Sequence, residues 1–267
     1  MIPTVRLMLF AYVCASPVQA ASGLEVLGVT GTDNRQIEDS RGTPWNAIGR
    51  LNITTGGFCT ATVIGPRRVL TAAHCLWNRR TARWYPPCAL HFLSAYRRGD
   101  YAVHSLVSEI RVVSGFDIAR RNINADWAVV TLDRDISAQV DAITISAAQP
   151  DRPGLLIQAG YSRDRPHLLT VDRTCRQTGT TRDGLVMTHD CDATFGDSGS
   201  PILRRQDDEY RLAGIHVAVQ RKNGNVQGLA VTSQAFADWI ASHPVTRPPG
   251  GAKACSIDDP TGSRVLG

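Results

Sequence analysis

Short apolar runs alternate with turn residues along most of this chain. From Trp45 onwards, runs rich in Val, Ile, Leu and Thr are separated by Gly, Pro, Asn and Asp. This spacing is typical of an all-β protein, in which many short strands are joined by turns. A further run opens at Asp126 and ends at Leu132, which suits a buried strand with a carboxylate at its rim. The other predicted strands are Trp45–Asn52, Cys59–Ile64, Arg68–Ala72, Leu90–Ala95, His104–Val113, Leu155–Ala159, Leu168–Asp172, Leu185–Thr188, Pro201–Arg204, Tyr210–Val219 and Gln227–Val231.

One segment has helical spacing instead. In Ser233–Ser242 the apolar Phe236 and Ile240 recur at helical spacing, after a hydroxyl residue that can cap the first turn. Residues 21–44 are polar and rich in turn residues, so we interpret them as an N-terminal arm or a propeptide. Residues 244–267 contain a Pro-Pro-Gly-Gly stretch and are expected to form a C-terminal tail.

The first twenty residues have the pattern of a signal peptide. Arg6 precedes the short apolar run from Leu7 to Val13, and Val18-Gln19-Ala20 offers small residues at a cleavage site. An uncleaved membrane anchor is the alternative, although the run is too short to span a bilayer comfortably. We therefore expect a soluble, exported protein that is secreted or periplasmic and makes no membrane contact once the signal is removed.

The cysteines fit an oxidising compartment. Cys14 lies in the predicted signal, and the remaining six can form three disulfides. Cys59–Cys75 is favoured because the strand, turn and strand between these residues would bring their ends together. Cys175–Cys191 would bracket a hairpin, and Cys88–Cys255 follows by elimination. No CxxC or His-Cys cluster has the spacing of metal ligands, so we predict no metal site.

The positive charge has two interpretations. The formal net charge is +5, and 27 of the 29 basic residues are arginine. A surface for nucleic acid would explain five Arg-Arg pairs, but the pairs are spread along the chain and no aromatic residues are interleaved with them. We therefore interpret them as scattered surface residues and predict no nucleic-acid partner. The five pairs are at positions 67–68, 79–80, 97–98, 120–121 and 204–205.

Three short motifs supply the groups of a serine nucleophile. The motifs are TAAHC at 71–75, DWAVV at 126–130 and GDSGSP at 196–201. A serine hydroxyl needs a base to accept its proton and a third group to hold that base in the correct tautomer. Ser198, His74 and Asp126 are the candidates, each in its own local context. The glycine-rich turn can also supply backbone donors for an oxyanion.

These motifs resemble those of the trypsin/chymotrypsin-like serine endopeptidases from about Trp45 to Trp239. Ser200 replaces the second glycine of the usual GDSGGP, and with the stretch Asp33–Ile37 this is similar to the bacterial glutamyl endopeptidases. The resemblance implies an all-β fold of two antiparallel six-stranded β-barrels, over about 45–140 and 141–232, with a C-terminal α-helix over about 233–242. The domain would then span 45–243, with the site in the cleft between the barrels.

The resemblance also implies the roles of further residues. The oxyanion donors would be the backbone N–H groups of Gly196 and Ser198, and Asp197 would receive a newly freed N-terminal ammonium. The usual activation sequence is absent, and Val26-Leu27-Gly28 is its nearest approximation. Whether the protein is a zymogen therefore stays open. We expect polypeptide substrates, no cofactor and a monomeric state.

The residue before the scissile bond (P1) is where the patterns disagree. Asp192 lies six residues before Ser198, where trypsins carry the carboxylate that pairs with a basic P1 side chain. Gly214-Ile215-His216 is similar to the strand whose histidine contacts an acidic P1 side chain in glutamyl endopeptidases. We take a basic P1 residue as the expectation, with acidic and small or apolar residues as alternatives.

Two other functions are considered for the same motifs. A catalytically silent protease-like barrel could act as a binding module, although such proteins usually lose a triad residue first, and here all three are present. An esterase or lipase is excluded, because the chain has no GxSxG elbow and the order His, Asp, Ser is wrong for that fold.

Overall fold

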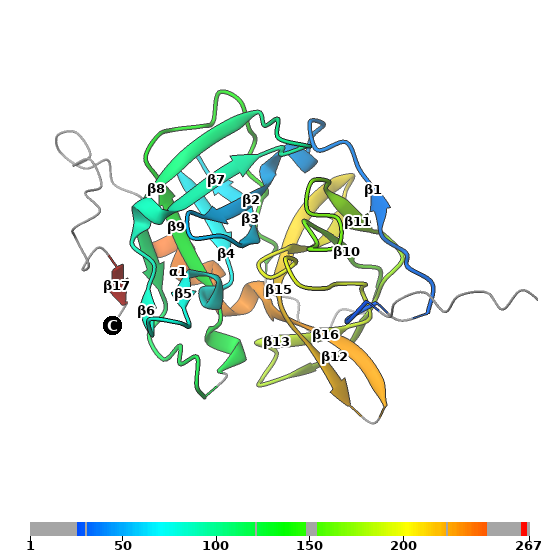
Figure 1. The fold of residues 1–267 in the computed structure, drawn as a ribbon. Coiled ribbons are helices and arrows are strands. Elements are labelled where there is room, and N and C mark those ends of the chain that lie inside the picture. The colour runs from blue at the N-terminus through cyan, green and yellow to red at the C-terminus, as the bar shows by residue number, and fades with distance from the viewer. Residues whose placement is uncertain are drawn as a thin grey trace, which may run out of the picture.

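The structure is a computed structural model that describes residues 26–29, 31–120, 122–147, 154–222, 224–244 and 263–265. The described residues are mostly β and form two bodies of strands that lie side by side (Figure 1). The predicted signal peptide and most of the predicted tail lie outside the described residues. None of the helices in the described ranges is long and apolar enough to cross a membrane.

The first body is a closed six-stranded barrel. Its strands follow the order β8-β7-β2-β3-β4-β9, and β9 pairs again with β8 to close the ring. Every pair within this ring is antiparallel. The strands are β2 (Ile48–Ile53), β3 (Phe58–Gly65), β4 (Arg68–Thr71), β7 (Leu90–Ser94), β8 (Val103–Val112) and β9 (Ala128–Leu132). Outside the ring are the short pair β5 (Trp77–Asn78) and β6 (Arg83–Trp84), and β17 (Ser263–Val265), which runs parallel to β8.

The second body is a sheet of eight strands that bends round in the same way. Its order is β1-β11-β10-β14-β15-β16-β13-β12, and an isolated bridge between Leu155 and Arg176 connects the start of β10 to the start of β12. The strands are β1 (Gln36–Ile37), β10 (Ile157–Gly160), β11 (Thr170–Asp172), β12 (Gln177–Thr181), β13 (Val186–His189), β14 (Pro201–Gln206), β15 (Glu209–Lys222) and β16 (Asn225–Thr232). The all-β fold is therefore confirmed, with one closed six-stranded barrel, while the second body has eight strands.

The C-terminal helix ties the end of the second body to the first. The α-helix α1 (Ala237–Ser242) follows a single 3-10 turn, η5 (Ser233–Ala235). Trp127, directly before β9, packs against Phe236 at a ring-centroid distance of 5.9 Å and against Trp239 at 5.6 Å. Because aromatic rings carry large apolar areas, these contacts bury the outer side of β9, and every residue of β9 is buried.

The predicted elements differ from the structure at several places. Trp45 lies in a 3-10 turn, η1 (Trp45–Ala47), so the first strand of the barrel begins later, at Ile48. The predicted helix is α-helical only from Ala237. The strand β12 was not predicted, because its sequence Gln-Thr-Gly-Thr-Thr is polar and lies on a half-exposed edge of the sheet. The hairpin between Cys175 and Cys191, of which β12 is one arm, was predicted.

The N-terminal arm is part of the second body. β1 pairs with β11, and the carbonyl of Gly28 accepts a hydrogen bond from the backbone N–H of Ala193. The guanidinium of Arg35 is buried and bonds Asp33 and Asp164 at 2.8–3.0 Å. Burial acts to lower the pKa of Arg35, but the bonds to these carboxylates outweigh it and raise the pKa. This arm is therefore anchored by a buried cation as well as by strand pairing.

Arg35→Met should destabilise the fold. The change removes the cation and leaves Asp33 and Asp164 facing each other with less compensation. Breaking a fully buried pair costs about 3–5 kcal/mol. We expect the free energy of unfolding to fall by about 2 kcal/mol here, because the side chains of both carboxylates are more than a quarter exposed to solvent. Urea unfolding measures the effect.

The matched control is Arg41→Met. Arg41 lies in the same arm and pairs with Asp100, but both side chains are mostly exposed. Exposed pairs contribute about 0–1 kcal/mol, so this variant should unfold close to the wild type. Equal unfolding midpoints for the two variants would contradict the anchoring role of Arg35.

Candidate active site

The three motifs come together where the two barrels face each other. His74 lies in the 3-10 turn η2 (Ala73–Leu76) after β4, and Asp126 lies two residues before β9. Ser198 lies on the turn that leads into β14. Two of the three residues thus come from the first barrel and one from the second. The ends of strands from both barrels thus bring the three motifs close together.

Asp126 holds His74 at two points. One carboxylate oxygen accepts the backbone N–H of His74 at 2.9 Å, and the other lies 2.7 Å from His74 Nδ1. Asp126 is itself buried. A carboxylate at Nδ1 keeps the proton of the neutral imidazole on that nitrogen and leaves Nε2 free to act as a base.

The Ser198 turn needs glycine at two positions. Gly196 and Gly199 have φ of +96° and +82°. A Cβ on Gly196 would lie 2.5 Å from the carbonyl oxygen of Tyr161, and one on Gly199 would lie 2.2 Å from that of Thr60. Only a residue without a Cβ can therefore occupy these places without a shift of backbone.

The carbonyls of this turn are held by Thr60 of β3. The backbone N–H of Thr60 donates to the carbonyl of Ser198 at 3.0 Å, and its hydroxyl donates to the carbonyl of Gly196 at 3.1 Å. Among the hydrogen bonds of the described residues, none uses the N–H of Gly196 or of Ser198. Two backbone donors on one turn are thus available to a ligand oxygen, which is what an oxyanion hole requires.

Ser198 Oγ and His74 Nε2 do not share a hydrogen bond among those found for the described residues. Such bonds are often long in a free enzyme and tighten when substrate binds. The rival serines of the sequence have other surroundings. Ser162 Oγ donates to Asp197 at 2.7 Å, and Ser200 Oγ is buried against Gly160 with no partner among the described residues.

Asp197 is buried beneath the turn. One of its carboxylate oxygens accepts bonds from Ser162 Oγ at 2.7 Å and from the backbone N–H of Thr194 at 2.9 Å. Burial raises the pKa of Asp197 to about 6, and these two bonds offset part of the effect. Val26 would be the new N-terminus if the chain were cleaved before Val26-Leu27-Gly28, and among the hydrogen bonds of the described residues it makes none to Asp197.

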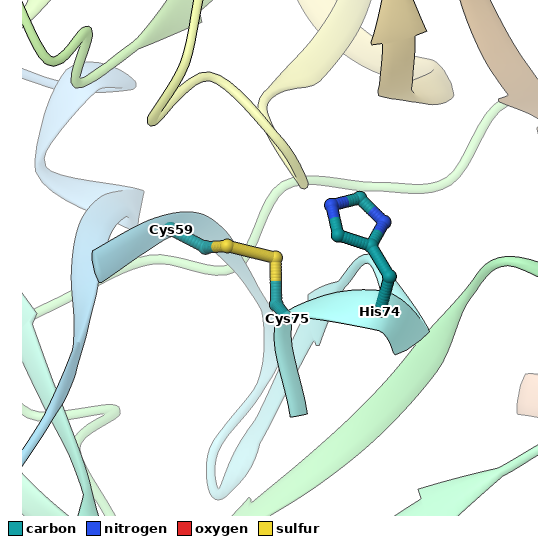
Figure 2. A group of neighbouring side chains, drawn as sticks. All are labelled: Cys59, His74 and Cys75. Atoms are coloured by element: carbon teal, nitrogen blue, oxygen red, sulfur yellow. A yellow bond between two sulfur atoms is a disulfide. The ribbon is translucent and has the colours of Figure 1, made fainter. Parts of the chain in front are cut away.

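A disulfide lies beside the imidazole. Cys59 and Cys75 are bonded, and Figure 2 shows the bond next to the ring of His74. The three side chains are close enough to be considered as a metal-binding group. However, the sulfurs of a disulfide are not thiolates, and thiolates are the metal ligands. The group does not fit a metal ion.

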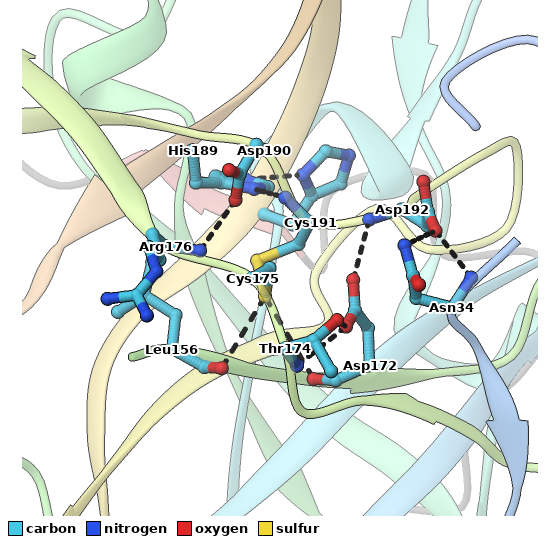
Figure 3. The surroundings of a disulfide bond; sticks show 11 residues. Asn34, Leu156, Asp172, Thr174, Cys175, Arg176, His189, Asp190, Cys191 and Asp192 are labelled. Atoms are coloured by element: carbon cyan, nitrogen blue, oxygen red, sulfur yellow. Dashed lines mark hydrogen bonds between the residues drawn. A yellow bond between two sulfur atoms is a disulfide. The ribbon is translucent and has the colours of Figure 1, made fainter. Parts of the chain in front are cut away.

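The second disulfide lies in the second barrel. Cys175 and Cys191 are bonded, as the hairpin between them predicted (Figure 3). The remaining predicted pair, Cys88–Cys255, involves Cys255, which lies outside the described residues. That pairing stays a prediction.

Two buried histidines form a chain of hydrogen bonds. The backbone N–H of Cys191 donates to His189 Nδ1 at 3.2 Å, and His189 Nε2 lies 3.1 Å from His216 Nδ1. Burial lowers the pKa of His189 to about 3. It also lowers the pKa of His216, with smaller contributions from His189 and His74. Both rings are therefore neutral at physiological pH.

This series of hydrogen bonds determines which nitrogen of each imidazole ring carries the proton. Because Cys191 donates to His189 Nδ1, the proton of His189 is on Nε2 and is donated to His216 Nδ1. The proton of His216 is then on Nε2. Gly228 of β16 makes room for this arrangement, since a Cβ there would lie 2.1 Å from the ring of His189. Sequence reasoning selected His216 but missed His189, whose only signal is its place before Cys191.

Asp192 is engaged by the N-terminal arm. Its carboxylate accepts the backbone N–H of Asn34 at 2.7 Å and the Asn34 side-chain amide at 3.1 Å. Its own N–H donates to Asp172 at 3.0 Å, as Figure 3 shows. Asp192 and His216, the two candidate residues for P1, thus bind different partners, Asn34 and His189. Asn34 was not among the predicted site residues.

Comparison with known proteins identifies the family. Residues 30–240 match the Trypsin family, so this chain belongs to it. The chain is a trypsin-like serine endopeptidase with similarity to glutamyl endopeptidases. A solved structure of Glu endopeptidase in complex with MPD superimposes with a TM-score of 0.66 at 22% identity, over 80% of this chain and 98% of that one.

Curated relatives come from bacteria and animals. Glutamyl endopeptidase of Bacillus licheniformis is 23% identical over 231 residues, which cover 83% of this chain and 70% of that protein. CLIP domain-containing serine protease B4 of Anopheles gambiae is 24% identical and covers 74% and 66%. Serine protease 23 of Bos taurus is 28% identical and covers 58% and 45%. The chain thus spans less than two thirds of the length of these two animal relatives.

His189 should contribute to loss of stability in acid. Its pKa is lowered in the fold, so below about pH 6.5 the unfolded chain binds a proton at this residue that the folded chain does not. Stability is therefore complete above pH 6.5 and falls as pH decreases, by about 1.4 kcal/mol per pH unit for one such group.

His189→Gln tests this contribution. An amide keeps a donor and an acceptor but does not titrate in this range. The free energy of unfolding of the variant, measured in urea between pH 6.5 and 4, should fall less steeply than that of the wild type. Parallel profiles would mean that His189 is not buried in its neutral form.

Proposed function

We propose that this protein is a secreted endopeptidase in which Ser198, His74 and Asp126 act as a catalytic triad through an acyl-enzyme. The observation that carries the proposal is the two-point contact of Asp126 with His74, next to a turn with two unused backbone donors. Positioning of the base and stabilisation of the oxyanion are the two requirements of serine catalysis.

The chemistry proceeds in two halves. Ser198 Oγ attacks the scissile carbonyl, and its proton moves to His74 Nε2. The oxyanion binds the N–H groups of Gly196 and Ser198, where each donor is worth about 3 kcal/mol. The C–N bond then breaks as His74 returns the proton to the leaving amine. Water, deprotonated by His74, cleaves the acyl-enzyme in the second half, and Ser198 regains its proton.

For the P1 residue we propose an acidic side chain, in place of the basic one expected from the sequence. Asp192 already accepts two hydrogen bonds from Asn34, so its carboxylate is not available in the way a basic P1 side chain needs. His216 Nε2–H is a donor with no partner among the described residues and suits a carboxylate. A Bacillus licheniformis relative is named glutamyl endopeptidase.

We also propose export through the predicted signal peptide, followed by action on polypeptides as a monomer. Two disulfides support an oxidising compartment. A catalytically silent binding module is the second candidate. A fluorophosphonate separates the two, because it reacts only with an activated serine.

Ser198→Ala should lower peptide hydrolysis by at least about a thousandfold with an unchanged fold. The change removes the covalent route and leaves only substrate binding and the oxyanion donors. The measurement is kcat/KM on a peptide substrate, with circular dichroism for the fold and fluorophosphonate labelling of both forms. Ser200→Ala is the matched control and should still be labelled. A Ser198→Ala variant with a tenth of the wild-type rate would refute the assignment.

Substrate choice should depend on His216. On peptide anilides that differ only at P1, glutamate should exceed lysine in kcat/KM. His216→Phe should lower the glutamate value by about tenfold to a hundredfold, since a hydrogen bond to a charged group is worth about 1.5–3 kcal/mol. The kcat/KM of the anilide with alanine at P1 should change far less in this variant. A preference for lysine in the wild type would contradict the proposed pocket.

A further inference from the structure

A hollow lies beside His74, and its lining does not include His216, the residue of the proposed P1 site. It has a volume of about 400 Å³ and lies over the Cys59–Cys75 disulfide. The disulfide and the imidazole lie side by side in Figure 2. Around them, the lining includes the guanidinium-bearing Arg79, Arg80 and Arg163.

The hollow is positively charged. No Asp or Glu is among its lining residues. Among the ion pairs of the described residues, none involves Arg79, Arg80 or Arg163, whereas Arg35 and Arg165 each pair with a carboxylate. These three cations are therefore available to an anion.

Arg163 is fixed close to the oxyanion turn. Its backbone N–H donates to the carbonyl of Phe195 at 2.6 Å, and its guanidinium lies 5.2 Å from the centre of the Phe195 ring. Phe195 directly precedes Gly196 and is more than half exposed. The charge of Arg163 thus lies at the edge of the proposed site, on the second barrel. Arg79 and Arg80 face the same hollow from the first barrel.

The hollow is on the side from which the amine leaves. In the proposed mechanism the P1 side chain points towards His216, and the amine takes its proton from His74. The residues after the scissile bond must therefore continue past His74, away from the His216 pocket. The hollow over the disulfide is where His74, Cys59 and Cys75 form the surface on that side.

We propose that Arg79, Arg80 and Arg163 select substrates with acidic residues directly after the scissile bond, at P1′ to P3′. This inference rests on the proposed function and adds the second half of the substrate. A guanidinium suits a carboxylate because its planar N–H groups can bind both oxygens. The pair 79–80, which looked like one of several scattered Arg-Arg pairs in the sequence, thereby gains a role.

The selection should be graded and sensitive to salt. All three arginines are exposed, so each contact with a carboxylate is screened by water and ions. One such contact changes kcat/KM by up to about fivefold. Three together should give a preference of about tenfold at low ionic strength, and most of it should vanish in 0.5 M salt, where the screening length falls to about 4 Å.

The test compares peptides with the same acyl half. Their P1′ to P3′ residues are all aspartate, all alanine or all lysine, and kcat/KM is measured for each. The variants are Arg79→Gln with Arg80→Gln, Arg163→Gln, and all three together. Arg134→Gln is the matched control, because Arg134 is exposed, makes no ion pair with a described residue and does not line the hollow. For the wild type and the control, kcat/KM should be highest for the aspartate peptide, lower for the alanine peptide and lowest for the lysine peptide.

In the triple variant the three peptides should be cleaved at similar rates. An aspartate preference that persists in this variant, or is absent in the wild type at low salt, overturns the inference. An anilide that ends at P1 distinguishes this failure from failure of the proposed function. If the anilide is cleaved but the peptides show no aspartate preference, only the proposed role of the arginines is rejected. If no substrate is cleaved, the proposed function itself is rejected. If the triple variant does not fold, the inference is tested with Arg163→Gln, which should weaken the aspartate preference, and with the wild type in salt, where most of that preference should vanish.

Discussion

The bonds that Thr60 makes across the two barrels hold the candidate site together. Thr60 is buried in β3 of the first barrel, and both its N–H and its hydroxyl donate to carbonyls of the Ser198 turn in the second. Its own hydroxyl accepts the N–H of Tyr161, and its carbonyl accepts Thr71 Oγ1. Because the carbonyls of the turn point towards Thr60, the N–H groups of Gly196 and Ser198 remain available. Thr60, whose side chain can both donate and accept a hydrogen bond, therefore positions the Ser198 turn relative to the first barrel.

The N-terminal arm supports the same region from the second barrel. Arg35 binds Asp164 in the loop after β10, and the same loop contacts the oxyanion turn through Ser162 and Arg163. One residue earlier, Asn34 satisfies the carboxylate of Asp192. The arm therefore both anchors the loop beside the Ser198 turn and supplies hydrogen-bond donors to the carboxylate of Asp192.

The proposed recognition of anionic substrates uses different groups on the two sides of the candidate site. On one side, two buried neutral imidazoles present a single N–H donor at His216. On the other side, three guanidinium groups surround the hollow over the disulfide. The interaction with His216 depends on burial and hydrogen bonding and is insensitive to salt, whereas the charges of the exposed arginines are screened by ions. The two ends would therefore contribute differently to recognition.

The sequence by itself determined the all-β fold, the three motifs and two disulfides, because each rests on local patterns: alternation in strands, glycine at the Ser198 turn, and cysteines that flank hairpins. It did not predict β12, whose residues are polar, or the short pair β5–β6. The partners of Asp192 and His216 were decided only by the tertiary structure, since Asn34 lies 158 positions from Asp192 and His189 lies 27 positions from His216. Hydrogen bonds over such separations leave no periodic signal, because they depend on how strands from distant parts of the chain are brought together.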